Sequence, residues 1–145
     1  MPAPWAYFDT SVLVKRYVRE PGSTRARALL RRHRFLSSAI APAEVMSALC
    51  RRGAAGDLAQ RDLMAILSRI QRDRAYWELV EVSPLVLSHT EDLVQKTALR
   101  TLDALHVASA LVFQAASGFR IPFLTGDARQ GETAERLALD TVWVG

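Results

Sequence analysis

The chain has 145 residues and a mass of 16.1 kDa, the size of one domain. Half of its residues are hydrophobic and 23% are charged, which excludes a disordered charged tail and a collagen-like repeat. The single cysteine, Cys50, cannot form an internal disulfide, and we expect it to be a small core residue. No apolar run is long enough to span a bilayer, and the N-terminus lacks a signal-peptide pattern, so we expect a cytoplasmic protein with no membrane contact.

Charge is distributed unevenly along the chain. The net charge is +4, but residues 1–75 carry 14 Lys/Arg and 6 Asp/Glu, whereas residues 76–145 carry 5 and 9. Basic clusters lie at residues 15–16, 31–34 and 51–52. This asymmetry favours a polyanionic partner, because phosphates bound by basic residues release their counterions. Arginines that merely decorate solvated helix faces are the alternative interpretation.

Short apolar segments alternate along the chain with segments of helical periodicity. The predicted strands are residues 5–8, 35–38, 78–82, 121–125 and 141–144. The predicted helices are residues 10–17, a second helix capped by Thr24, then 42–53, 58–76, 84–99, 102–116 with Thr101 as cap, and 133–139. This order predicts one α/β domain over residues 1–145. Its central, mostly parallel sheet would have about four or five strands, with helices on both faces.

Four carboxylates fall at positions where strands end or helices begin. They are Asp9, Glu44, Asp103 and Asp127. Each has an ordinary explanation, because acids stabilise helix N-termini. All four nevertheless map to the edge of the sheet where ligands bind in such folds. Clustered carboxylates repel one another, so at least one pKa should be raised, and an all-oxygen site favours Mg²⁺ or Mn²⁺.

Four motifs carry a family resemblance. They are residues 8–15 (FDTSVLVK), 43–45 (AEV), 102–110 (LDALHVASA) and 124–127 (LTGD). In this order they resemble the acidic motifs of PIN-domain nucleases, and more narrowly those of VapC-type toxins of toxin–antitoxin pairs. The resemblance implies a metal-dependent endoribonuclease that cuts RNA, forms a homodimer and binds a cognate antitoxin.

The resemblance also implies residue roles. It assigns metal binding to Asp9, Glu44, Asp103 and Asp127. It assigns substrate or water positioning to Thr10, Ser11 and Thr125. Some family members carry a fifth acid just after the last motif, where this chain has Arg129 and Gln130. The number of metal ions, one or two, is therefore left open.

Several other residues allow two interpretations. His106 either acts in the site, by orienting Asp103 three residues earlier or by contacting RNA, or is a buried structural histidine. Trp5, Trp77 and Trp143 are expected to pack beside strands. Two alternatives to the nuclease remain: a degenerate PIN-fold module that binds RNA or acts as a scaffold, and a Mg²⁺-binding receiver-like or phosphatase-like domain.

Overall fold

The computed structural model describes residues 2–145, whose five strands form one sheet. The strands are β1 (Trp5–Phe8), β2 (Arg34–Ser38), β3 (Glu78–Val80), β4 (Pro122–Thr125) and β5 (Asp140–Trp143). Their order is β3-β2-β1-β4-β5, and every neighbouring pair is parallel. The predicted α/β class is confirmed, and the sheet is entirely parallel.

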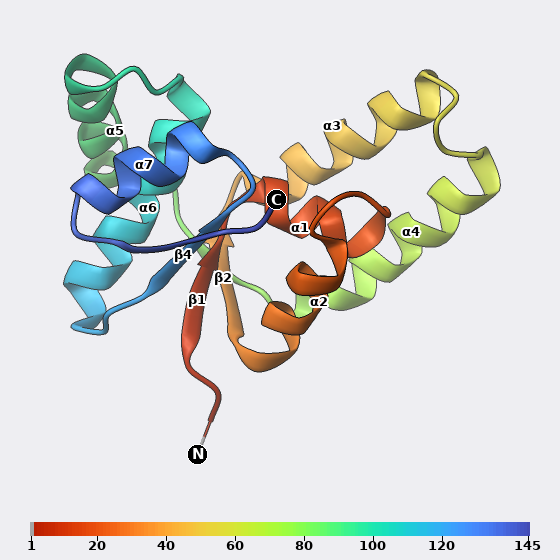
Figure 1. Ribbon diagram of the computed structural model, residues 1–145, viewed down its shortest axis with the longest axis horizontal. Helices are drawn as coiled ribbons and strands as arrows, with labels where there is room; N and C mark the ends of the chain where they lie inside the picture. Colours follow the sequence, from red (N-terminus) through yellow and green to blue (C-terminus); the bar gives the residue numbers. More distant parts are fainter. Residues whose placement is uncertain (1) are drawn as a thin grey trace.

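Helices cover both faces of the sheet. They are α1 (Thr10–Tyr17), α2 (Ser23–Arg32), α3 (Ala41–Ala54), α4 (Gln60–Asp73), the 3₁₀ helix η1 (Arg74–Tyr76), α5 (Pro84–Lys96), α6 (Thr101–Ser117) and α7 (Ala128–Arg136). In Figure 1, α5, α6 and α7 lie on one side of the sheet, and α1 to α4 lie on the other. The helices α3 and α4 form an antiparallel pair that projects from the body of the domain (Figure 1).

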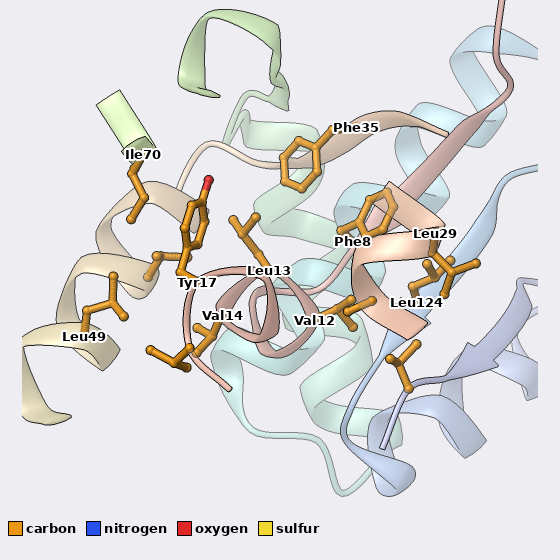
Figure 2. Close-up of a cluster of buried hydrophobic side chains, with 14 of the residues drawn as sticks. Phe8, Val12, Leu13, Val14, Tyr17, Leu29, Phe35, Leu49, Ile70 and Leu124 are labelled. Carbon is orange, nitrogen blue, oxygen red and sulfur yellow. The ribbon is translucent and has the colours of Figure 1, made fainter. Parts of the chain in front are cut away.

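Strand alternation divides the core into two layers. Tyr7, Leu36 and Phe123 point to the α5–α7 side, where they join one buried cluster. Their neighbours Phe8 and Phe35 point to the α1–α4 side, as Figure 2 shows. Both clusters contain fully buried residues from the central strands, as expected for a parallel sheet covered on both faces. The central strands are therefore packed on both faces, and this packing positions the residues that follow them.

Three predicted helix starts are wrong. Thr24 does not cap α2, which begins one residue earlier after Gly22 in the left-handed region at φ 87°. Thr101 is the first residue of α6, and its N-cap, Arg100, makes no side-chain capping bond. The last helix begins at Ala128 instead of residue 133, because the Asp127 side chain caps it by accepting from the Gln130 N–H at 3.1 Å.

The sheet reverses its direction of growth between β1 and β4. From β1 the chain adds β2 and β3 on one side, and later adds β4 and β5 on the other. In open parallel sheets a crevice forms at this reversal, outside the carboxyl ends of the strands. Asp9 follows β1 there, and Asp127 follows β4 after Thr125 and Gly126. Within residues 2–145 no helix is long and apolar enough to cross a membrane.

Candidate active site

All four predicted carboxylates line one cavity at this crevice. The cavity measures about 330 Å³, and its lining includes Asp9, Glu44, Asp103 and Asp127. The predicted gathering of these acids at one sheet edge is confirmed, whereas their role as metal ligands stays a prediction. As placed in residues 2–145, no three His, Cys, Asp or Glu side chains are close enough to surround a metal ion.

The Asp9 carboxylate is held from both sides. Its Oδ2 accepts the Ser11 hydroxyl at 2.5 Å and the Ser11 N–H at 3.1 Å, which makes Asp9 the N-cap of α1. Ser11 Oγ in turn accepts the Gly126 N–H at 2.9 Å. A Cβ at Gly126 would lie 3.1 Å from both Lys15 Cε and the Val144 carbonyl oxygen, so glycine permits this close approach. Asp9 is thus tied to the chain that leaves β4.

Glu44 is bound to His106, which sequence analysis paired with Asp103. His106 is 1% exposed, and its Nε2 lies 2.6 Å from Glu44 Oε1. The Thr10 hydroxyl donates to the same oxygen at 2.8 Å, and the Tyr7 hydroxyl lies 2.8 Å from His106 Nδ1. His106 is therefore buried and also orients a carboxylate, but that carboxylate is Glu44.

This contact changes both pKa values. Burial alone lowers the pKa of His106, but the hydrogen bond to Glu44 and the charges of Asp9, Glu44 and Asp103 raise it above its ordinary value. Burial alone raises the pKa of Glu44, but the hydrogen bond and charge of His106, helped by Thr10, lower it. Both shifts favour the charged forms, so the contact is an ion pair wherever His106 is protonated and Glu44 is ionised.

The pKa of Asp103 is shifted in the opposite direction to that of Glu44. Burial raises its pKa, and the charges of Asp9 and Asp127 raise it further, with a smaller contribution from Glu44. The expectation that at least one of the four acids has a raised pKa is confirmed here.

Gln130 is a site residue whose role sequence analysis missed. It is fully buried, and its amide nitrogen donates to Asp9 Oδ1 and to the Asp103 carbonyl oxygen, each at 3.2 Å. Its amide oxygen accepts the Thr125 hydroxyl at 2.6 Å. Thr125 is also fully buried, so its hydroxyl reaches the acids through Gln130.

Two side chains differ from their predicted surroundings. Cys50 is exposed on α3, and Trp143 is 56% exposed on the edge strand β5. Trp5 and Trp77 do pack against the core clusters. A cavity of about 500 Å³ lies at the other end of the strands, where Trp5, Phe35 and Trp77 line it, far from the four acids along the strands.

Replacing Glu44 by Gln should lower the melting temperature by about 3–12 °C, the effect of losing a charged hydrogen bond. Because the pKa of His106 is raised in the folded state, its contact with Glu44 contributes its full stability below pH 6.5, the ordinary pKa of histidine. That stability is lost as pH rises through the folded-state pKa of His106. On the acid side it is lost as pH falls through the lowered pKa of Glu44. Melts of both proteins from pH 4 to pH 9 should show the largest difference near pH 6; a difference independent of pH would contradict the ion pair.

Comparisons with known proteins match the chain to one family. The PIN domain family model matches residues 6–136. Ribonuclease VapC46 of Mycobacterium tuberculosis is 42% identical over 105 residues, covering 72% of each chain. Ribonuclease VapC45 of the same species is 37% identical over 113 residues, covering 74% of this chain and 76% of the relative.

Solved structures show the same fold. A toxin–antitoxin complex from Klebsiella pneumoniae contains a chain that superposes with a TM-score of 0.63 at 19% identity, covering 97% of this chain and 98% of that one. A chain of VapBC2 from Rickettsia felis bound to promoter DNA gives 0.63 at 15% identity with the same coverage. Together with the family match and the 37–42% identities, these likenesses establish that the chain belongs to the PIN-domain family, in its VapC-type ribonuclease branch.

Proposed function

We propose that the chain is an endoribonuclease that hydrolyses RNA phosphodiester bonds with Mg²⁺ or Mn²⁺, as the toxin of a toxin–antitoxin pair. The single observation that carries this proposal is the cavity lined by all four motif acids at the crevice between β1 and β4. Membership in a family of ribonucleases supports the reaction class and leaves no support for a receiver-like or phosphatase-like domain.

The donor atoms fit a hard divalent cation. The four acids offer carboxylate oxygens only, which suit Mg²⁺ or Mn²⁺. Burial, together with the nearby charges of Asp9 and Asp127, raises the pKa of Asp103. Asp9 and Asp103 would be the primary ligands, with Glu44 and Asp127 bound directly or through water. A bound cation supplies activation of water and stabilisation of the charge that develops on the phosphate.

The chain's own hydroxyls orient these carboxylates. Thr10 donates to Glu44, and Ser11 donates to Asp9. Both residues also line the cavity, where their remaining lone pairs can accept from a water or a ribose hydroxyl. No serine or cysteine nucleophile is needed, since water attacks the phosphodiester.

Basic side chains flank the acidic cavity on both sides. One adjoining cavity, of about 360 Å³, is shared by Asp103 and Asp127 with Arg100 and Arg129. The other, of about 570 Å³, is lined by Lys15, Arg51 and Arg52.

Only some of these cations are free to bind phosphate. Lys15 and Arg52 pair with Glu20. Arg51 lines the acidic cavity and donates to the neutral Ser47 hydroxyl of its own helix, with no acidic partner among residues 2–145. Arg100 and Arg129 make no side-chain hydrogen bond or ion pair with any residue from 2 to 145. We assign the phosphates on either side of the cleaved bond to Arg51 and to the Arg100–Arg129 pair. The basic amino-terminal half therefore supplies one side of this surface and the carboxyl-terminal half the other.

Replacing Arg51, Arg100 or Arg129 by Gln should weaken binding of single-stranded RNA several-fold and flatten its salt dependence. One lost phosphate contact should reduce the slope of log K against log [salt] by about 0.7. Arg120→Gln is the matched control, because Arg120 is exposed and pairs with Asp140 at the amino ends of β4 and β5. Titrations at four salt concentrations, with cleavage blocked by Asp103→Asn, give both quantities. Equal slopes for the Arg100 and Arg120 variants would contradict the assignment.

A circular single-stranded RNA tests the reaction class. An endonuclease opens the circle to a linear product, whereas a degenerate binding module retains it uncut. We expect the purified chain with Mn²⁺ to open circular RNA, and a circular DNA of the same sequence shows whether the 2′-hydroxyl is required. Binding of circular RNA without opening it would support the scaffold alternative.

The partner assignments belong to the same proposal. The structural neighbours include a toxin–antitoxin complex and a VapBC assembly, which supports an antitoxin for this chain. An arginine from such a partner can bind a carboxylate in two-pronged fashion and replace the cation's charge. We also expect a homodimer. Co-expression with the neighbouring gene product should yield an inactive complex; purification of the chain alone and active in its presence would contradict the assignment.

A further inference from the structure

Gln130 bonds three of the four motif acids, two through its buried side-chain amide and one through its backbone N–H. It lies in the first turn of α7, fully buried, and its backbone N–H donates to Asp127 Oδ1. Its side chain bonds the carboxylate of Asp9 and the backbone carbonyl of Asp103. These bonds link the ends of β1 and β4 to the start of α6.

The direction of every bond in this network is determined. Asp9 Oδ1 and the Asp103 carbonyl oxygen only accept, so the amide nitrogen of Gln130 must face them. The amide oxygen then faces Thr125, whose hydroxyl donates to it at 2.6 Å. The Thr125 oxygen itself accepts the Asp127 N–H at 3.0 Å. The chain of donors therefore runs from Asp127 through Thr125 and Gln130 to Asp9.

The amide fixes the rotation of the Asp9 carboxylate. Ser11 holds Oδ2, and Gln130 holds Oδ1. Each carboxylate oxygen accepts at about two lone-pair positions. The Ser11 hydroxyl and N–H use both positions of Oδ2, so the remaining position of Oδ1 is the one that a cation can use. A carboxylate held at both oxygens loses little freedom when it becomes a ligand, which is how residues behind the ligands raise metal affinity.

No other common side chain of this size serves the same purpose. An ionised glutamate has no proton to donate to Asp9 and would add a negative charge beside it. A leucine or methionine would leave the Asp9 oxygen and the Thr125 hydroxyl without this partner. A glutamine supplies a donor and an acceptor without charge.

We propose that Gln130 is a positioning residue of the metal site, whose amide orients Asp9 and sets its spacing from Asp103 for a divalent cation. The proposal rests on the proposed metal dependence. It assigns a role to the position beside which some family members carry a fifth acid, and that role requires no charge.

The test compares Mn²⁺ affinity in two glutamine variants. Gln130→Met preserves side-chain length, and we expect it to weaken Mn²⁺ binding by about 10- to 100-fold, the usual effect of removing a partner of a metal ligand. Gln114→Met is the matched control, because Gln114 also bonds the backbone, at the Ile121 N–H, but at the far end of α6. Both variants should lose stability, and only the Gln130 variant should lose Mn²⁺ affinity. Calorimetric titration and the Mn²⁺-dependent rise in melting temperature measure it on the whole chain without RNA.

A second pair of variants covers a failure of Gln130→Met to fold. Thr125→Val removes the hydroxyl that orients the amide, whereas Thr125→Ser retains it. We expect weaker Mn²⁺ binding for the valine variant and affinity near that of the wild type for the serine variant. Wild-type affinity in a folded Gln130→Met variant, or in Thr125→Val, would overturn the role of Gln130 alone. A wild-type chain that binds no Mn²⁺ would overturn the metal proposal as well.

Discussion

Asp103→Asn should reduce RNA cleavage about a thousandfold and leave RNA affinity within about twofold. Asparagine preserves the shape of the side chain but removes the charge of a proposed primary ligand in the cavity that Asp9 and Asp127 also line. Cation stabilisation of the reacting phosphate contributes about 4 kcal/mol, and each 1.36 kcal/mol changes the rate about tenfold. Single-turnover cleavage and equilibrium binding of one labelled RNA measure the two effects separately.

Asp92→Asn is the control for this experiment. Asp92 is an exposed acid on α5 and does not line the cavity. It should cut RNA at the wild-type rate. If Asp103→Asn also cuts at the wild-type rate, then Asp103 merely stabilises the start of α6.

Asp103→Asn should also stabilise the metal-free protein at neutral pH. Burial and the charges of Asp9 and Asp127 raise the pKa of Asp103, so its ionised form is disfavoured in the folded state. That penalty is complete above the raised pKa and is relieved as pH falls through it toward the ordinary value of 3.8. Asp103→Asn should therefore melt at a higher temperature than the wild type at pH 7. The difference should vanish below about pH 4.

Added Mn²⁺ should reverse the order of the melting temperatures of the wild type and Asp103→Asn. At one hundred times its dissociation constant, a cation that binds only the folded state contributes about 2.7 kcal/mol, or about 5–11 °C here. The wild type should gain this amount, and Asp103→Asn should gain much less. Function and stability would then be opposed at this residue. A variant that melts lower without metal and gains as much from Mn²⁺ would identify Asp103 as an ordinary residue of a helix start.

The positions of the acids were predictable because parallel strands end at one edge. Asp9 and Asp127 follow buried apolar strands, and Glu44 and Asp103 begin apolar helices, so local sequence was enough. The partners of the acids were not predictable. His106 meets Glu44 across 62 residues of sequence, and this pairing depends on how α3 and α6 pack.

Gln130 and the start of α7 escaped prediction for a related reason. Arg129, Gln130 and Gly131 show no apolar periodicity, so the segment resembles a loop. The Asp127 cap was the available signal. Cys50 was misjudged although helical spacing from the buried Val45 and Leu49 turns it toward solvent.

The central claim is that the clustered acids act through a divalent cation, and metal dependence of circular-RNA opening tests it most directly. The wild-type chain is stripped with a chelator, assayed, and assayed again after excess Mn²⁺ is added. After chelation, the rate at which circular RNA is opened should fall to that of the Asp103→Asn variant, and it should return fully with Mn²⁺. Opening that continues at its original rate after exhaustive chelation would contradict the account.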